Sequence, residues 1–296
     1  MKKNLLAYLP VIAPFVFVVL WSSGFVGSRL SAPYADPLTF LAIRMLLAGV
    51  LLVPIVYFIK QSYPSTLKDI AHSSVAGILL NACYLGSVFY IVSHHFPIAM
   101  TALVMGLQPI LGSIIIVLIF KKEHMTGRQW LGMLLGFAGL VLVLVPDFDL
   151  GQTNGVSLTN IVICLLGMLG ITIGTLYQKY FCAHISIAGG ASVQYLASAV
   201  VLAVVAFFLE EGNIVWNAQS VFALFWLVVI LSMGAVLLFF YLLKNHSSSS
   251  VSTLLYSVPA LVAVEGYFMF DEVLSFVSVV GMVLTIIGVY MALKKG

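Results

Sequence analysis

Charged residues are scarce in this chain of 296 residues. Asp, Glu, Lys and Arg make up 8% of the sequence, whereas hydrophobic residues make up 62%. Soluble domains carry about 25% charged residues, so no aqueous fold could cover this much apolar surface. The formal net charge of +3 is not arranged as a basic stripe with interleaved aromatics, which argues against a nucleic-acid partner.

Several chemical motifs are also absent. The three cysteines, Cys83, Cys164 and Cys182, are odd in number and lack metal-ligand spacing. No glycine-rich loop precedes a Lys-Ser or Lys-Thr pair, as a phosphate-binding loop requires. The longest polar stretch, residues 147–157, has only the length of a linker. We therefore expect no metal, no cofactor and no nucleotide-hydrolysing domain on this chain.

Long hydrophobic runs dominate what is present. A membrane-spanning helix needs roughly 20 apolar residues, and ten runs approach or exceed that length. They predict an all-α integral membrane protein in a lipid bilayer, with ten transmembrane helices: Leu9–Ser28, Leu38–Ile59, Ile70–Ser93, Ile98–Phe120, Gln129–Val145, Leu158–Gln178, Ile187–Leu209, Ala218–Leu243, Val251–Phe270 and Val273–Leu293.

The two halves of the chain repeat each other. The matched pairs at an offset of 150 are Gly24 with Gly174, Arg29 with Lys179, Arg44 with Gln194 and Pro109 with Pro259. At an offset of 149, Glu123-x-x-Thr126 matches Glu272-x-x-Ser275, Gly132 matches Gly281 and Gly139 matches Gly288. We predict a first repeat at 1–146, a linker at 147–157 and a second repeat at 158–296. Because five crossings per repeat is an odd number, the two five-helix repeats must be inverted, which places a binding site at their seam near the bilayer midplane.

Basic residues predict the orientation, because Lys and Arg accumulate in short cytoplasmic loops. With a cytoplasmic N-terminus, the loops outside contain no Lys or Arg and hold Asp147, Asp149, Glu210 and Glu211. We therefore expect both termini in the cytoplasm. Eleven of the 13 basic residues then lie inside: Lys2, Lys3, Lys60, Lys68, Lys121, Lys122, Arg128, Lys179, Lys244, Lys294 and Lys295.

These features carry a family resemblance. The segments are Trp21-Ser22-Ser23-Gly24-Phe25, Pro37-Leu38-Thr39-Phe40, Ala42-Ile43-Arg44 and Gly106-Leu107-Gln108-Pro109, together with the repeated Glu-x-x-Thr/Ser and glycine pattern. In order and spacing the set resembles the EamA branch of the drug/metabolite transporter superfamily. The resemblance implies a ten-helix inverted-repeat fold in a bacterial inner membrane, and members that export amino acids and related metabolites.

Two prolines within predicted helices are candidate gates. Pro109 and Pro259 each leave a carbonyl about one turn earlier without its N–H partner, and inside a bilayer such a group needs protein, water or ligand. A packed kink that only fits neighbouring helices is the alternative. Val258 precedes the second proline where Gln108 precedes the first, so the two halves of the predicted cavity differ chemically.

Glu265 is the most specific site candidate. An acid inside a membrane helix is costly unless it faces a cavity or a partner, and Glu265 lies two turns from Val258, on the same helix face. It could bind a substrate amine, exchange a proton, or do both in turn, and an internal pair with Arg44 is the alternative. For Arg44 we favour a structural role, in which it ties its helix to carbonyls or acids of neighbouring helices and its long stem can reach outward, over a clamp on a substrate carboxylate.

The other binding candidates are polar or aromatic residues near the predicted seam, where rings can hold apolar groups or ammonium. They are Gln108, Trp21, Ser23, Tyr84, Tyr90, Tyr177, Tyr241 and Tyr256. Glu123 and Glu272 are expected to cap the helices that open at Thr126 and Ser275. Glycines 132, 136, 139, 281 and 288 predict close helix contacts, within a monomer or across a homodimer.

The resulting functional hypothesis is a secondary transporter that exports small polar metabolites, amino acids or amines, by alternating access, with proton coupling open. The alternative is an uncoupled facilitator or exchanger of cationic amines such as polyamines. An intramembrane enzyme is the remote alternative, because the sequence has no His-Glu-x-x-His, no Gly-x-Ser-x-Gly and no paired intramembrane aspartates.

Overall fold

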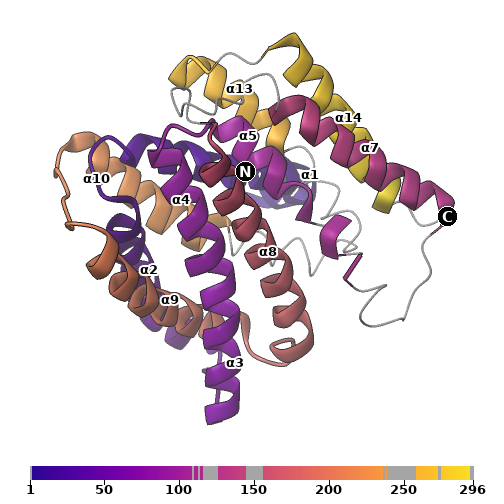
Figure 1. The fold of residues 1–296 in the computed structure, drawn as a ribbon. Helices are drawn as coiled ribbons and strands as arrows, with labels where there is room; N and C mark the ends of the chain where they lie inside the picture. The colour runs from indigo at the N-terminus through magenta and orange to yellow at the C-terminus, as the bar shows by residue number, and fades with distance from the viewer. Residues whose placement is uncertain are drawn as a thin grey trace.

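A computed structural model describes residues 2–108, 110–112, 114–115, 126–144, 156–235, 238, 258–272 and 275–293. Within these ranges the regular structure is helical throughout (Figure 1). The elements are α1 (Lys2–Ser31), α2 (Pro37–Phe58), α3 (Leu67–Gly77), η1 (Ile78–Leu85), α4 (Gly86–Ser93), α5 (Ile98–Met105), α7 (Gly127–Leu144), α8 (Leu158–Phe181), α9 (Ile187–Leu209), α10 (Ala218–Phe225), η2 (Trp226–Ala235), α13 (Val258–Phe270) and α14 (Phe276–Leu293).

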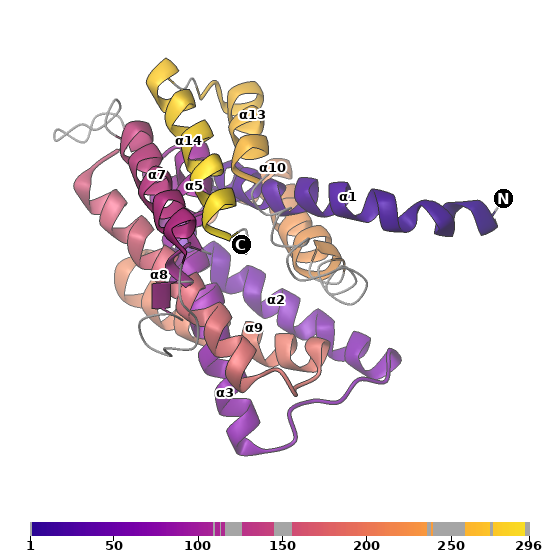
Figure 2. The same cartoon turned by 90° about the vertical axis from the view of Figure 1, so that its right-hand side faces the viewer.

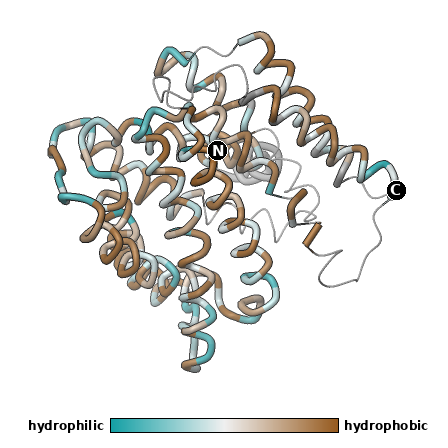
Figure 3. Tube along the Cα trace, in the orientation of Figure 1, coloured by the Kyte–Doolittle hydropathy of each residue, from teal (hydrophilic) through white to brown (hydrophobic). Residues whose placement is uncertain are grey.

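Six helical segments are long and apolar enough to cross a membrane: Ala13–Ser31, Pro37–Phe58, Leu67–Ser93, Leu158–Phe181, Ile187–Leu209 and Ala218–Ala235. Hydrophobic residues run along the helices, whereas hydrophilic ones gather near helix ends and connections (Figure 3). Large apolar side chains face outward, including Phe58, Phe207 and Phe268, as expected of a surface covered by lipid. The chain is therefore a multi-pass membrane protein.

Equivalent helices of the two halves pack together. Helix α2 lies along α9 and α7 lies along α14, and these two pairs make the most extensive contacts between the described elements (Figures 1 and 2). Helix α1 of the first half packs on α10, η2 and α13 of the second. Helix α8 of the second half packs on α3, η1, α4 and α5 of the first. A two-repeat architecture fits this exchange of partners.

Helix ends are also capped across the two halves. The Glu210 carboxylate accepts hydrogen bonds at 2.8 Å from the backbone N–H groups of Leu38 and Thr39, at the start of α2. The Gln61 side chain accepts one at 2.9 Å from the N–H of Ala188, at the start of α9. Leu38 and Ala188 stand at equivalent positions of the two repeats. Each half thus supplies a hydrogen-bond acceptor for the free N–H groups at the start of a helix of the other half.

Glu272 caps a different helix from the one that its sequence position suggests. Both of its carboxylate oxygens lie 3.1 Å from the backbone N of Ile98, at the start of α5. The cap of α14 is provided instead by Ser275, whose Oγ accepts a hydrogen bond at 3.0 Å from the N–H of Ser278. The expected hydroxyl cap at Ser275 is therefore confirmed, whereas the hydrogen bonds of the Glu272 carboxylate go to α5.

The environment of Glu272 predicts a pH effect on stability. Burial raises the pKa of this carboxyl from its ordinary value of 4.5. Hydrogen bonds from the N–H groups of Ile98 and Ala99 and the charge of Arg29 lower the pKa, but by less than burial raises it. An acid with a raised folded-state pKa stabilises the fold below its unfolded pKa, and this stabilisation is lost as pH rises through the folded pKa. As pH increases from 4.5 upward, the thermal midpoint of the wild type should therefore fall relative to that of Glu272→Gln. A constant difference in midpoint would contradict this.

Glycines bring α7 and α14 into direct backbone contact. A Cβ at Gly139 would lie 2.5 Å from the Gly281 carbonyl oxygen, and a Cβ at Gly288 would lie 2.3 Å from the Gly136 nitrogen. The Thr285 hydroxyl also approaches the Gly136 carbonyl at 3.4 Å. The predicted small-residue contact therefore forms between two helices of one chain.

This contact predicts a large effect of one added methyl group. Gly288→Ala should force α7 and α14 apart and lower the free energy of unfolding by about 1–3 kcal/mol. Gly127→Ala is the matched control, because nothing lies within 4 Å of a Cβ at that position on α7. Chemical denaturation in detergent measures both variants. Equal stability of the two variants would rule out the close backbone contact.

Two segments within the helices are wider than an α-helix. The π-helical segments η1 and η2 occupy nearly equivalent positions of the two repeats, Ile78–Leu85 and Trp226–Ala235. In η2 the Ser232 hydroxyl donates a hydrogen bond at 2.9 Å to the carbonyl of Leu227, five residues earlier. Such π turns are rare and concentrate at functional sites. They direct attention to the region between η1, α1 and α13.

Candidate functional site

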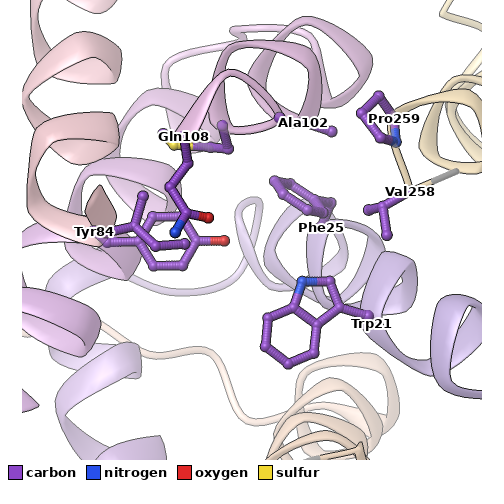
Figure 4. A pocket seen from close by; sticks show the side chains of 10 residues that line it. Trp21, Phe25, Tyr84, Ala102, Gln108, Val258 and Pro259 are labelled. Carbon is purple, nitrogen blue, oxygen red and sulfur yellow. The ribbon is translucent and has the colours of Figure 1, made fainter. Parts of the chain in front are cut away.

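A cavity of about 60 Å³ lies between elements of both halves (Figure 4). That volume is enough for on the order of four water molecules, or for a small part of a polar solute. Its walls come from α1, η1, α5, α8 and α13 and from residues just after α5. The lining residues are Trp21, Phe25, Tyr84, Ala102, Met105, Gly106, Gln108, Ile171, Val258 and Pro259.

Residues at equivalent positions of the two repeats line this cavity together. Trp21 and Ile171 are 150 residues apart and both line it, as do Gln108 and Val258. Figure 4 shows Gln108 and Tyr84 on one side of the cavity and Val258 and Pro259 on the other. The cavity therefore sits at the junction of the halves, and its two sides are unequal because a polar amide faces a valine.

Gln108 is a polar group in a mostly apolar wall. Its Nε2 donates a hydrogen bond at 2.9 Å to the Thr175 hydroxyl, which in turn donates to the Ile171 carbonyl at 2.7 Å. Sequence reasoning did not single out Thr175, Ile171 or Phe25. The repeat offset could have found them, because Thr175 matches Phe25 and Ile171 matches Trp21.

The two predicted gate prolines differ in what can be said of them. Pro259 lines the cavity at the start of α13, directly after Val258. Pro109, Tyr241 and Tyr256 lie outside the described residues. A gating role for the pair remains a prediction.

Glu265 is bound through one carboxylate oxygen. Its Oε1 accepts a hydrogen bond at 2.8 Å from Ser22 Oγ on α1, next to the cavity residue Trp21. Its Oε2 is buried and has no hydrogen-bond partner. The alternative of an internal pair with Arg44 is not realised, since the described part of the chain has no ion pair between them.

Arg44 lies in the interior and does not reach outward. Its side chain is 4% exposed, and Nη2 donates a long hydrogen bond of 3.3 Å to Ser232 on η2. Its guanidinium carbon lies 5.8 Å from the centre of the Phe89 ring, whereas Nε is buried without a hydrogen-bond partner. The long stem therefore does not carry the charge outward, and the hydrogen bond to Ser232 joins α2 to η2. A structural role for Arg44 stays a prediction.

Three of the predicted binding residues are engaged away from the ten residues that line the cavity. Tyr177 hydrogen-bonds His72 through its hydroxyl at 2.7 Å. Tyr90 stacks on His94 with ring centroids 4.2 Å apart. Ser23 Oγ accepts a hydrogen bond at 2.9 Å from the Trp226 indole N–H. Trp21, Tyr84 and Gln108 are the binding candidates that the structure brings together at the cavity.

The amino-acid sequence is similar to those of known membrane transporters. Residues 9–145 and 158–294 each match the EamA-like transporter family. Relatives include YvbV of Bacillus subtilis, named an uncharacterized transporter, which is 22% identical over 94% of this chain and 89% of its own length. Another is YedA of Escherichia coli K12, named an uncharacterized inner membrane transporter, at 23% identity over 89% of this chain and 83% of YedA.

Two further similarities bear on the fold and the range of the family. An S-adenosylmethionine uptake transporter of Rickettsia felis is 25% identical over 92% of this chain and 88% of its own length. A solved crystal structure at 16% identity superposes with a TM-score of 0.65 over 95% of this chain and 96% of that one. Its likeness supports the helical fold.

The fold, the cavity between halves and these similarities define a membrane transporter. The chain belongs to the EamA-like transporter family, whose pattern it matches once in each half. The family resemblance that the sequence motifs carry is thereby confirmed.

Proposed function

We propose that this protein is a secondary transporter that exports small polar metabolites, amino acids or amines, by alternating access. The observation that carries the proposal is the cavity, because residues at equivalent positions of the two repeats line it. In transporters built from inverted repeats, the substrate site lies at the repeat interface. Gln108 and Tyr84 supply polar groups, while Trp21 and Phe25 supply rings that suit an apolar side chain.

The proposed topology is ten transmembrane helices in two inverted five-helix repeats. Contacts between helix connections support it, because they fall into two sets that match the two predicted faces. Glu210 meets Leu38 and Glu272 meets Ile98, at positions expected outside. Gln61 meets Ala188 and Asp69 meets His184, at positions expected inside.

The proposed location is a bacterial inner membrane, with both termini in the cytoplasm. The distribution of Lys and Arg supports this orientation, as does the name of the E. coli relative, an inner membrane transporter. Amino acids as substrates gain support from the Rickettsia relative, named for S-adenosylmethionine, which is an amino-acid derivative. That relative is named for uptake, whereas we propose export, so the direction of transport across the membrane must also be measured.

Counterflow in proteoliposomes tests the proposal. The purified protein is reconstituted with an unlabelled solute inside, and labelled phenylalanine, phenethylamine or spermidine is added outside. We expect transient accumulation of intact labelled solute that depends on the protein. Accumulation of spermidine alone, unaffected by a pH gradient, would favour the uncoupled facilitator of cationic amines. Chemical conversion of the solute would point to an enzyme and overturn the proposal.

A further inference from the structure

The contacts of Ser22 call for one hydrogen more than this hydroxyl has. Ser22 is fully buried on α1. Its Oγ lies 3.0 Å from the Val19 carbonyl oxygen and 2.8 Å from Glu265 Oε1. A hydroxyl has one hydrogen to donate, and an ionised carboxylate can only accept. With Glu265 ionised, the Ser22 hydroxyl would therefore have to divide one hydrogen between two acceptors.

The neighbouring serine has the same arrangement with a donor of known direction. Ser23 Oγ donates to the Leu20 carbonyl, three residues earlier, at 2.6 Å. It accepts a hydrogen bond at 2.9 Å from the Trp226 indole N–H, a group that can only donate. Ser22 likewise lies next to a carbonyl three residues earlier, and Glu265 takes the place of the indole. This comparison indicates that a carboxylic acid donates to the Ser22 oxygen.

The second oxygen of Glu265 also fits a neutral carboxyl group. Oε2 is buried and has no hydrogen-bond partner. In an ionised carboxylate this oxygen would share the negative charge with no donor beside it, which is far more costly than burying a carbonyl oxygen. With the proton on Oε1, Oε2 is a carbonyl oxygen.

The described neighbours of α13 supply no base that offsets a charge on Glu265. Helix α13 packs chiefly on α1 and α5, and α5 has no titratable side chain. Within the membrane-spanning part of α1 the only such side chain is Arg29, near its end, which donates to the Val92 carbonyl at 3.1 Å. Tyr267 on α13 is exposed, and Glu272 beyond its end bonds the start of α5.

We propose that Ser22 and Glu265 form a proton-binding site where the two halves meet, in which Ser22 is a positioning residue that accepts the hydrogen bond of the Glu265 carboxylic acid. When the O–H bond at Oε1 breaks, the proton passes to water that reaches the cavity. The carboxylate left behind can then accept hydrogen bonds from an ammonium group. Proton and ammonium therefore exclude each other at Glu265. This exclusion rests on the proposed transport function, whereas the proton site stands on the contacts alone.

Infrared spectroscopy of the reconstituted protein at neutral pH tests the proton directly. A protonated carboxyl group has a C=O stretching band that an ionised carboxylate lacks. We expect this band in the wild type and its loss in Glu265→Gln, whereas Glu211→Gln, which changes an exposed acid, should keep it. Absence of the band from the wild type, or an undiminished band in Glu265→Gln, would overturn the inference whatever the protein transports.

Ser22→Ala tests the positioning role. Without the Ser22 oxygen the acid form loses its acceptor, so the pH at which protons displace labelled phenethylamine in counterflow should fall by roughly 0.5–1 pH unit, the size of one lost hydrogen bond. Ser28→Ala is the matched control. Ser28 is also buried on α1, and its hydroxyl donates to the Phe25 carbonyl, three residues earlier, at 2.7 Å. That variant should keep the wild-type pH profile.

The outcomes separate this inference from the proposed function. A wild-type pH profile in Ser22→Ala would overturn the role of Ser22. Should Ser22→Ala fail to fold, Glu265→Gln is the second variant, and its phenethylamine flux should not depend on pH. Wild-type flux of phenethylamine that is independent of pH below neutrality, where this solute stays an ammonium ion, would overturn the exclusion and leave transport intact. If the wild type moves none of phenylalanine, phenethylamine and spermidine, the proposed function fails, and the infrared band still decides the proton site.

Discussion

Glu265→Gln should reduce transport of substrates that carry an ammonium group by roughly tenfold or more, while neutral substrates are affected little. The Oε2 atom is buried and unpartnered, so a cation that reaches it would find a free acceptor. Glutamine keeps the shape and the contact with Ser22, and it removes the charge that makes such a hydrogen bond strong. Uptake of charged and neutral solutes by reconstituted protein measures the effect.

Glu211→Gln is the matched control for this variant. Glu211 is an exposed acid in the connection between α9 and α10, where it accepts a hydrogen bond from Asn213 at 2.9 Å. The same acid-to-amide change there should leave both classes of substrate unaffected. A Glu265→Gln protein with an unchanged substrate profile and an unchanged pH dependence would end the hypothesis that Glu265 is a site residue.

The same variant separates amine binding from proton exchange. If Glu265 also carries the exchanged proton, Glu265→Gln should flatten the dependence of flux on an imposed pH gradient. Counterflow without a gradient should then be affected less than gradient-driven transport. Because Glu265 and Arg44 form no ion pair, adding Arg44→Gln should not restore stability, as it would if each change had left the other charge unpaired.

The class of fold and its internal repetition could be predicted from the sequence, because both depend on patterns along the chain. Apolar runs identify membrane helices. The offsets of 150 between Gly24 and Gly174 and of 149 between Gly139 and Gly288 identify repeats. The offset also describes the cavity, which Trp21 lines together with Ile171 and Gln108 together with Val258. Helical geometry explains why Tyr177 is turned away: it is two residues from Thr175, or about 200° around α8.

Other features depend on packing that no local pattern encodes. Segments η1 and η2 are ordinary apolar runs in sequence, so no local pattern marks their π-helical form. Glu272 precedes α14, yet it caps α5, whose first N–H belongs to a residue 174 positions away. Arg44 was expected to reach outward, but Ser232 and Phe89 hold it inside. Each outcome was decided by a partner distant in the chain.

Gln108→Ala should weaken substrate binding by about tenfold with expression and thermal stability unchanged. The amide is one of the polar groups at a cavity lined mainly by apolar side chains. A hydrogen bond lost from a buried polar substrate group leaves that group unsatisfied, which accounts for an effect of this size. Stability should be kept because Thr175, the partner of Gln108, still donates to the Ile171 carbonyl.

Val258→Ala is the matched control for Gln108→Ala. Val258 occupies the equivalent position of the second repeat and lines the same cavity, but it offers no hydrogen bond. If the cavity binds substrate through its polar side, Val258→Ala should lower affinity less than Gln108→Ala does, because only the part of the two lost methyl groups that touches the substrate gives up apolar contact. Binding to both variants is measured by the concentration dependence of counterflow. Normal transport by Gln108→Ala, or equal losses in the two variants, would show that the amide does not recognise the substrate and that the cavity selects by shape alone.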